Sequence, residues 1–338
     1  MRILISTGIY TPDIGGPAIY ARNLYDTWKA EGYDVKVAAY RWERAFPPIV
    51  RHFLFLLKVL RKGRNADLIL VLDTWSAAVP TMVACTLLRK KYVIRTGGDF
   101  LWESYVERTE EPVLFRDFYT TCMPKLSLKE SLVYKLSKLV LRKADKIIFS
   151  TEWQRKIFID AYALVQGKTY IVENFCGEKT EQISPEKRVF VAGARNIRLK
   201  NLDLLRSAIS EARKELRQKS FEDIELDTNK AMASNFIEKV RSAYAIILIS
   251  ISDISPNMIL DALRAGVPFI VTKENGITDR IKDYALFVDP NNKQDIVEKI
   301  VWLSDPKNRE LQKEKISKFN WVHTWKEIAG EIVQVWEK

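Results

Sequence analysis

The sequence contains few of the residues on which metal centres and nucleophilic catalysis usually rely. Its 338 residues include two histidines, His52 and His323, and three cysteines whose spacing fits neither a metal site nor a redox pair. No Asp-x-Asp triplet occurs, which speaks against divalent-cation chemistry through that motif. These gaps argue against a zinc centre and a histidine-based triad. We expect Cys85, Cys122 and Cys176 to be buried thiols in a reducing cytosol.

Long apolar segments are missing as well. No apolar run reaches the ~18 residues of a membrane-spanning helix, and residues 1–6 read as a strand, which leaves no room for a signal peptide. We therefore expect a cytoplasmic protein. The length and the 47% hydrophobic composition suffice for two domains with full cores.

Positive charge is concentrated in the first half of the chain. Residues 1–175 hold 27 Lys and Arg against 18 Asp and Glu, whereas the remainder holds 27 against 25. Such an excess favours an anionic partner, which could be membrane lipid, a lipid diphosphate or nucleic acid. No nucleic-acid recognition motif accompanies it, so we expect no nucleic-acid partner.

Two segments, 47–64 and 125–143, combine apolar residues with several lysines and arginines. A helix of this composition can lie in a membrane interface with its basic residues near anionic head groups. The protein would then be peripheral at the inner membrane face. The alternative is an ordinary helix that packs on a core and ends in a solvated basic turn, and for 47–64 this alternative is favoured.

Strand-like and helix-like segments alternate in both halves of the chain. In the first half, strands are expected at Arg2–Thr7, Asp34–Tyr40, Leu68–Asp73, Tyr92–Thr96, Lys146–Ser150 and Thr169–Val172, and helices at Ala18–Glu31, 49–62, Ala77–Leu88 and about 127–143. After a hinge at 173–177, strands are expected at Arg188–Ala192, Phe221–Leu226, Ala245–Ile251 and Phe269–Thr272, and a final helix at 321–336. This alternation predicts an α/β protein with doubly wound parallel sheets.

The segment 253–276 is the most informative part of the sequence. Asp253 and Asp261 lie eight positions apart, between a strand that ends near Ile251 and a second strand that begins after Gly266. A strand, a loop, a helix beginning near Asn257 and another strand form a βαβ unit, whose ligand end is the edge where the strands terminate. Helix N–H groups there can bind a phosphate, and carboxylates accept hydrogen bonds from hydroxyls. Together they describe a pocket for a nucleotide sugar.

This segment resembles the carboxylate-x7-carboxylate signature of glycosyltransferase family 4, whose usual form is Glu-x7-Glu followed by Ala-x-x-x-Gly-x-Pro-Val-Ile. Here both acids are Asp, each one methylene shorter, and residues 262–270 read Ala-Leu-Arg-Ala-Gly-Val-Pro-Phe-Ile. The resemblance implies the GT-B fold: two Rossmann-like domains, 1–172 and 173–320, facing across a cleft, with the helix 321–338 packing back on the first. It also implies retaining transfer from a nucleoside diphosphate sugar, with UDP or GDP as the carrier, and neither a metal nor another cofactor.

A basic loop follows the first strand of the second half. Arg195 and Lys200 lie five positions apart after Gly193, where they can clamp a diphosphate, Arg through its fork and Lys as a point charge. The family has a similar Arg and Lys pair at this place with the same role. A solvated basic loop is the alternative.

Two further loops carry candidate residues. Gly15 and Gly16 follow the first strand, where glycines allow a close backbone approach to a ligand, although a plain turn is the alternative. In the family a Gly-Gly loop at this place lies near the donor phosphates and sugar. Asp99 follows the fourth strand in a Gly-Asp-x-x-Trp-Glu run, where some family members carry it and others a histidine. Asp99 would bind a sugar or acceptor hydroxyl, or alternatively cap the next helix.

The resemblance assigns the ribose hydroxyls to Asp261 and the sugar hydroxyls to Asp253. Helix-start residues Pro256, Asn257 and Met258 would lie beside the diphosphate. The expected acceptor is a glycan or a lipid-linked sugar, as in the synthesis of cell-surface glycans or glycolipids. Because both family glutamates are replaced, a non-catalytic partner subunit that binds nucleotide weakly is the alternative function.

Overall fold

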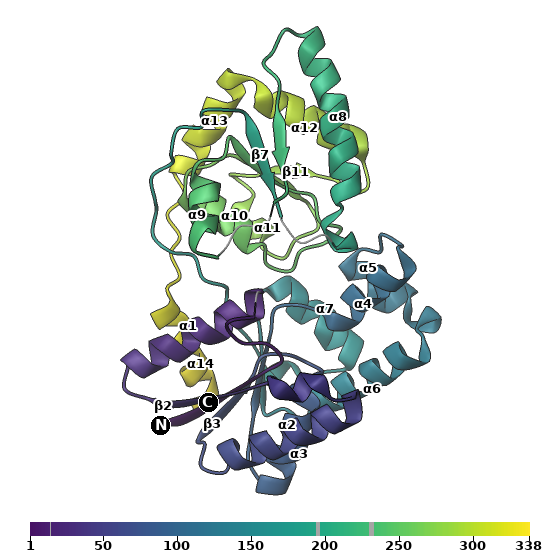
Figure 1. The fold of residues 1–338 in the computed structure, drawn as a ribbon, viewed down its shortest axis with the longest axis vertical. Coiled ribbons are helices and arrows are strands. Elements are labelled where there is room, and N and C mark those ends of the chain that lie inside the picture. Colours follow the sequence, from purple (N-terminus) through teal and green to yellow (C-terminus); the bar gives the residue numbers. More distant parts are fainter. Residues whose placement is uncertain (14, 194–196, 230–232) are drawn as a thin grey trace. The chain divides into compact units, whose positions relative to one another are not determined.

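The computed structural model describes residues 1–13, 15–193, 197–229 and 233–338. The chain forms two compact units, each with its own parallel sheet (Figure 1). Unit 1 comprises Met1–Ser104, Cys122–Asn174 and Thr324–Lys338, and unit 2 comprises Tyr105–Thr121 and Phe175–His323. The last helix of the chain therefore belongs to unit 1, and a short segment near residue 110 belongs to unit 2.

The sheet of unit 1 has six parallel strands in the order β2-β1-β3-β4-β5-β6. The strands are β1 (Arg2–Thr7), β2 (Asp34–Ala39), β3 (Leu68–Val71), β4 (Val93–Thr96), β5 (Lys146–Phe149) and β6 (Thr169–Ile171). All residues of β3 and β4 are buried, which is expected for strands covered by helices on both faces. Because the strands are parallel, their C-terminal ends lie at one edge of the sheet.

Helices cover both faces of this sheet. They are α1 (Gly16–Ala30), α2 (Pro48–Gly63), α3 (Ala78–Leu88), α6 (Leu128–Lys143), α7 (Glu152–Tyr162) and α14 (Trp325–Glu337), with α4 (Phe100–Thr109) crossing the unit boundary and short 3₁₀ turns at Trp42–Ala45 (η1), Met123–Lys125 (η2) and Gln166–Lys168 (η3). Helix α3 packs against both α2 and α6, so these three lie side by side (Figure 1). Helix α14 packs on α1, where Trp28 Nε1 donates to the carbonyl of Ala329 at 3.3 Å.

The sheet of unit 2 has five parallel strands in the order β11-β10-β9-β7-β8. The strands are β7 (Val189–Ala192), β8 (Glu225–Asp227), β9 (Ala245–Leu248), β10 (Phe269–Thr272) and β11 (Leu286–Val288). The helical elements are α5 (Phe115–Thr121), η4 (Arg198–Lys200), α8 (Leu202–Gln218), α9 (Ala233–Arg241), α10 (Asn257–Arg264), α11 (Thr278–Ile281), α12 (Lys293–Ser304) and α13 (Pro306–Ser317).

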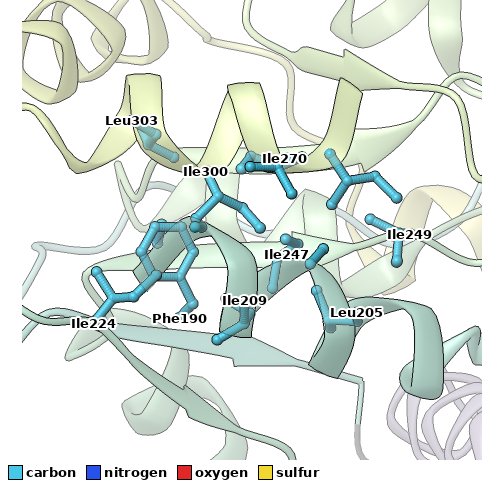
Figure 2. Close-up of a cluster of buried hydrophobic side chains, with 14 of the residues drawn as sticks. Phe190, Leu205, Ile209, Ile224, Ile247, Ile249, Ile270, Ile300 and Leu303 are labelled. Atoms are coloured by element: carbon cyan, nitrogen blue, oxygen red, sulfur yellow. The ribbon is translucent and has the colours of Figure 1, made fainter. Parts of the chain in front are cut away.

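Two apolar cores, one on each face, hold this second sheet between its helices. Figure 2 shows the core under α8 and α12, where Ile247 of β9 lies among side chains of both helices. The preceding residue, Ile246, belongs to the core on the α10 side. Successive residues of a strand point to opposite faces, and both faces are buried here. This is why β9 and β10 are continuous apolar runs in the sequence.

Most of the expected elements are present, with two shifts. The eighth strand is Glu225–Asp227, not Phe221–Leu226, because Phe221 and Ile224 pack against the α8 core from a connecting segment. The last helix begins at Trp325, not at 321. Thr324 forms a capping box with Glu327, and His323 instead pairs its backbone with Cys176.

The predicted burial of the three cysteines is confirmed, and none forms a disulfide. Within the described residues, no helix is both long and apolar enough to cross a bilayer.

Candidate functional site

The C-terminal edge of the sheet in unit 2 gathers three of the loops that the sequence singles out. Neighbouring strands β7, β9 and β10 end at this edge, and each is followed by a loop that carries charged residues. Lys200 comes from the loop after β7, Asp253 from the loop after β9, and Glu274 from the loop after β10. Binding crevices of doubly wound sheets lie at such edges.

Lys200 and Asp253 form an ion pair at this edge. The Nζ of Lys200 lies 2.9 Å from Oδ2 of Asp253 and 3.3 Å from Oγ of the buried Ser250. An ammonium group has three donors and a carboxylate accepts at two oxygens. The pair therefore uses two donors of Lys200 and, among the described residues, a single oxygen of Asp253. Within the described part of the chain, one N–H of Lys200 and one oxygen of Asp253 are thus left for a ligand.

The backbone around Lys200 is fixed from two directions. The N–H of Ile251 donates to the carbonyl of Leu199 at 2.9 Å, which ties η4 to the end of β9. Asn201 adopts a left-handed conformation with φ of 54°, which asparagine tolerates better than most residues. Its Nδ2 donates to the carbonyl of Pro290 at 2.7 Å. Arg195, the other predicted clamp residue, lies outside the described residues.

The loop that carries Asp253 is braced by the loop after β10. The N–H of Asp253 donates to the carbonyl of Glu274 at 2.8 Å, and the carbonyl of Asp253 accepts from the N–H of Gly276 at 3.1 Å. The Asn275 side chain donates to the carbonyl of Thr272 at 2.7 Å and accepts from the N–H of Ile277 at 3.0 Å. Both loops are thus held in one conformation, which places the Asp253 carboxylate beside Lys200.

A segment distant in sequence, Tyr105–Thr121, also supports these loops within unit 2. The Phe115 N–H donates to Oγ of Ser252 at 3.0 Å. Arg116 Nη1 lies 3.2 Å from Oε1 of the buried Glu274, whose pKa is raised by burial against the opposing effect of the Arg116 charge.

The same segment reaches the basic loop. The N–H of Arg198 donates to Oε1 of Glu107 at 2.7 Å, and its guanidinium lies 2.8 Å from Oε1 of Glu110. Sequence reasoning missed these supports, and it assigned no role to Ser250 or Glu274. Glu274 stands inside the segment already singled out, so its position was the available signal. The contacts with residues 107–116 had no signal, because they join positions about 90 or more apart.

Helix α10 starts next to Asp253 and has no side-chain cap. Pro256 occupies the capping position, and its carbonyl accepts from the N–H of Ile259 at 3.0 Å. Asn257 is exposed and Met258 is buried. A helix start without a side-chain cap presents backbone N–H groups to an anion.

Asp261 lies one turn further along α10, apart from the Lys200 pair. Its Oδ1 is 3.6 Å from Nη1 of Arg264, and its side chain is largely buried. Burial raises the pKa of Asp261 to about 6, and the Arg264 charge opposes this shift. A buried carboxylate with one distant cationic partner retains the capacity to accept hydrogen bonds from a ligand.

The remaining predicted residues, Gly15, Gly16 and Asp99, lie in unit 1. Gly15 precedes α1 with φ of 155°, a conformation that glycine adopts readily, and Gly16 is the first residue of the helix. Asp99 follows β4 and is buried; its Oδ1 accepts from the N–H groups of Leu101 and Trp102 at 2.9 and 3.1 Å. These contacts support the capping alternative for Asp99, while its role in substrate binding stays a prediction.

No group of three or more His, Cys, Asp or Glu side chains suited to a metal ion occurs among residues 1–13, 15–193, 197–229 and 233–338.

Comparison with known families identifies part of unit 2. Residues 229–319 match the family model described as glycosyl transferases group 1. This range contains Asp253, Glu274 and α10 and ends before the chain returns to unit 1. No match was found among curated proteins.

Several solved structures share the whole fold at low sequence identity. Sucrose-phosphate synthase from Thermosynechococcus elongatus superposes with a TM-score of 0.69 at 14% identity, covering 99% of this chain and 98% of that one. Anabaena HepE, solved with UDP and glucose, gives 0.67 at 14% identity over 100% and 99%. WaaG, a glycosyltransferase involved in lipopolysaccharide biosynthesis, gives 0.68 at 11% identity over 99% of both chains.

The predicted fold class is thus confirmed: two parallel sheets with alternating helices, matched along their full length by GT-B glycosyltransferases. The chain has the GT-B fold, and its residues 229–319 match the group 1 glycosyl transferases.

Proposed function

We propose that this chain is a retaining glycosyltransferase of family 4 that moves a sugar from a nucleoside diphosphate sugar to an acceptor hydroxyl without a metal ion. The observation that carries the proposal is the ion pair of Lys200 with Asp253 beside the uncapped start of α10. It combines a cation for a phosphate with a carboxylate for a hydroxyl at the edge where doubly wound sheets bind ligands. The group 1 match and the GT-B fold support the reaction class.

The leaving diphosphate is stabilised by positive groups of the protein in this proposal. Among the residues that the structure describes, Lys200 contacts Asp253 and Ser250, which leaves one of its three donors for a phosphate. Arg195 adds a second cation, and the turn at Pro256 aims the first N–H groups of α10, at Asn257 and Met258, toward the phosphates. Charge stabilisation of this kind acts on the developing negative charge of the leaving group, which is the role that a metal ion has elsewhere.

The two aspartates bind hydroxyl groups of the donor in this proposal. Asp253 accepts from the donor sugar through the oxygen that Lys200 does not use, and Asp261 accepts from the ribose. Attack from the face of the leaving group retains the anomeric configuration. The departing diphosphate takes the proton of the acceptor hydroxyl, so no separate protein base is required.

The proposal also gives roles to three residues of unit 1. Gly15 and Gly16 allow a close backbone approach to the donor, and Asp99 binds a sugar or acceptor hydroxyl in addition to capping α4. Among the similar structures, HepE was solved with UDP and with UDP-glucose, which favours a UDP-sugar over a GDP-sugar. WaaG is involved in lipopolysaccharide biosynthesis, which favours a glycan or lipid-linked acceptor in cell-surface synthesis.

A donor screen tests this function. Thermal stability and slow donor hydrolysis are measured with UDP-, GDP-, ADP- and dTDP-sugars, first without metal and then with it. We expect that sugar donors of one nucleotide raise the thermal stability of the protein and that one of these donors is hydrolysed, both without metal. Both effects should be lost in Asp253→Asn. The matched control is Asp203→Asn, an exposed aspartate of unit 2. If no donor in the panel stabilises the wild-type protein or is hydrolysed by it, the proposal is contradicted and a non-catalytic partner subunit is favoured.

A further inference from the structure

The helices α2, α3 and α6 of unit 1 form a layer whose outer side is unusually apolar. Here this side, with the η1 turn beside it, is called the basic-apolar face. It holds eleven of the fifteen exposed large apolar side chains among the described residues of unit 1. They are Trp42, Phe46, Ile49, Val50, Phe53, Leu57, Val83, Leu87, Leu128, Leu132 and Leu139.

Helix α2 shows how the face is built. Phe55 and Val59 are completely buried on its inner side, whereas Ile49, Phe53 and Leu57 form an outer stripe at a spacing of four residues. Ile49 is 86% exposed and Phe53 is 57% exposed. The outer stripe does not pack on a core, so the core-packed alternative explains only the inner side of this helix.

Helix α6 repeats this arrangement. Val133 and Val140 are buried, and Leu128, Leu132 and Leu139 are exposed on the other side, with Leu128 at 93%. Helix α3 lies between the two and contacts both, and it adds Val83 and Leu87 four residues apart (Figure 1). Scattered single apolar residues on a surface are ordinary, but stripes on three adjacent helices mark an interaction site.

The charge of the face is of one sign. Residues 47–64, 74–91 and 121–144 contain fourteen Lys and Arg and one acid, Glu130. That acid is buried in the capping box of α6 and adds no exposed negative charge. Nine of the basic side chains are exposed: Arg61, Arg64, Arg89, Lys91, Lys125, Lys129, Lys135, Arg142 and Lys143.

Three of the other lysines serve the fold instead. Lys58 pairs with the buried Glu43 and donates to the carbonyl of Ala39 at 2.9 Å. Lys62 and Lys90 donate to main-chain carbonyls of unit 1 at 2.5 and 2.6 Å. The exposed positive charge of the face is therefore that of the nine residues named above, without these three.

We propose that the basic-apolar face docks on a membrane surface rich in anionic phospholipids. Its apolar stripes would enter the boundary between head groups and acyl chains, while the interspersed Lys and Arg reach the lipid phosphates. Trp42 at the rim suits the interfacial zone, where tryptophan is enriched. The proposal does not depend on the proposed glycosyltransferase activity, and each can fail without the other.

The observed chemistry disfavours two other occupants. A second copy of the chain would bring a like-charged face against this one across a symmetric interface, and like charges at an interface repel. Nucleic acid would neutralise the charge but leave the stripes of Ile, Leu and Phe in water, because nucleic-acid interfaces are polar. A lipid surface satisfies both the charge and the apolar stripes.

Sedimentation of the full chain with vesicles tests the proposal. Vesicles of phosphatidylcholine with about one third phosphatidylglycerol are compared with pure phosphatidylcholine. We expect binding to the anionic vesicles that weakens at about 1 M salt, where the Debye length falls to about 3 Å. Equal binding to both vesicle types, or none to either, would overturn the proposal.

Two double variants separate the apolar and electrostatic contributions. Ile49→Ser with Phe53→Ser and, separately, Lys135→Glu with Arg142→Glu should each lower the vesicle partition coefficient by about tenfold or more. All four side chains are exposed, so both variants should stay folded, which circular dichroism checks.

Matched controls come from unit 2. Leu311→Ser, and Lys214→Glu with Lys315→Glu, change exposed side chains of α8 and α13 and should leave vesicle binding unchanged. Loss of binding in these controls to the same extent would contradict a specific face. A wild-type dimer in solution that the Ile49 and Phe53 double variant dissociates would identify a second copy as the occupant and overturn the proposal.

Discussion

The two units share one architecture but differ in how their charges and apolar side chains are distributed. Unit 1 has 27 Lys and Arg against 17 Asp and Glu, whereas unit 2 has 27 against 26. Among the described residues, unit 1 exposes fifteen large apolar side chains and unit 2 exposes four, Ile183, Trp302, Leu311 and Val322. The basic residues are equally numerous, so the difference lies in the acids that accompany them.

The positive charges of the two units also differ in their surroundings. In unit 2 a lysine at the site, Lys200, is held by a carboxylate that fixes its position, which suits the recognition of a small ligand. In unit 1 the exposed lysines and arginines of the basic-apolar face have no acidic neighbours on their own helices apart from the buried Glu130. Positive charges spread over a surface suit a broad anionic partner.

The largest effect is expected at the ion pair in unit 2. Lys200→Ala should lower turnover by roughly 10²-fold or more, because it removes a cation that stabilises the leaving diphosphate. Steady-state kinetics with the donor found in the screen measures this. Lys214→Ala, an exposed lysine of α8, is the matched control and should retain wild-type turnover. Equal turnover in the two variants would contradict the role of Lys200 in stabilising the leaving diphosphate.

The next effect concerns the pH dependence of nucleotide binding. The pKa of Asp261 is about 6 in the free protein because of burial. If its ionised form accepts the ribose hydroxyls, affinity should fall by about tenfold per pH unit below pH 6, since one proton must leave before the ligand binds. Calorimetry between pH 5 and pH 8 measures this (about one unit below and two above the pKa). Asp261→Asn should bind weakly at every pH, and a variant that keeps the wild-type pH profile would contradict the ribose role.

The raised pKa of Asp261 should also make the free energy of unfolding depend on pH in the absence of ligand. Its folded pKa of about 6 lies above the unfolded value near 4, so the folded chain retains a proton that the unfolded chain releases in this window. Stability should therefore fall as pH rises from about 4 to about 6, by at most ~3 kcal/mol for this group. Urea unfolding should therefore show that the free energy of unfolding of the wild type falls relative to that of Asp261→Asn as pH rises over that range. A profile identical to that of the wild type would contradict the raised pKa.

A smaller effect on stability is expected at Asn201, which places Lys200. Asn201→Ala should lower the free energy of unfolding by about 2 kcal/mol. Of this, about 1 kcal/mol comes from left-handed backbone strain and about 1 kcal/mol from the lost contact with Pro290. Asn201→Gly should lose only the contact, because glycine tolerates this φ. The difference between the two variants, measured by urea unfolding, isolates the backbone term. No difference would mean that the conformation at 201 is not required.

The sequence predicted the parts of this molecule that depend on local pattern. The apolar runs of β9 and β10 were recognisable because both faces of the sheet are buried, and the spacing of Asp253 after β9 placed it at the ligand edge. The contact of Lys200 with Asp253 was not predictable in this way. It depends on η4 being tied to the end of β9 through Leu199 and Ile251, which no local pattern encodes.

The basic-apolar face shows the complementary limit. The composition of 47–64 was apparent, but its sequence does not distinguish an outer apolar stripe from an inner one, since both have helical spacing. Only the packing of α2 on the sheet decides that Phe55 is inside and Phe53 is outside. The sequence therefore left both interpretations of this segment open, and its exposed apolar stripe became apparent only in the structure.

The smallest effect provides the sharpest comparison of the two sides of α2. Phe53→Ala should change the free energy of unfolding by less than about 0.5 kcal/mol, because the side chain is exposed. Phe55→Ala, two residues further along, should cost about 3–5 kcal/mol, because it empties a fully buried position that stacks on Tyr40 at 4.1 Å between ring centroids. Urea unfolding of both variants measures the contrast. A large loss for Phe53→Ala would mean that this ring packs on the protein in solution, and it would count against a face that is open to a membrane.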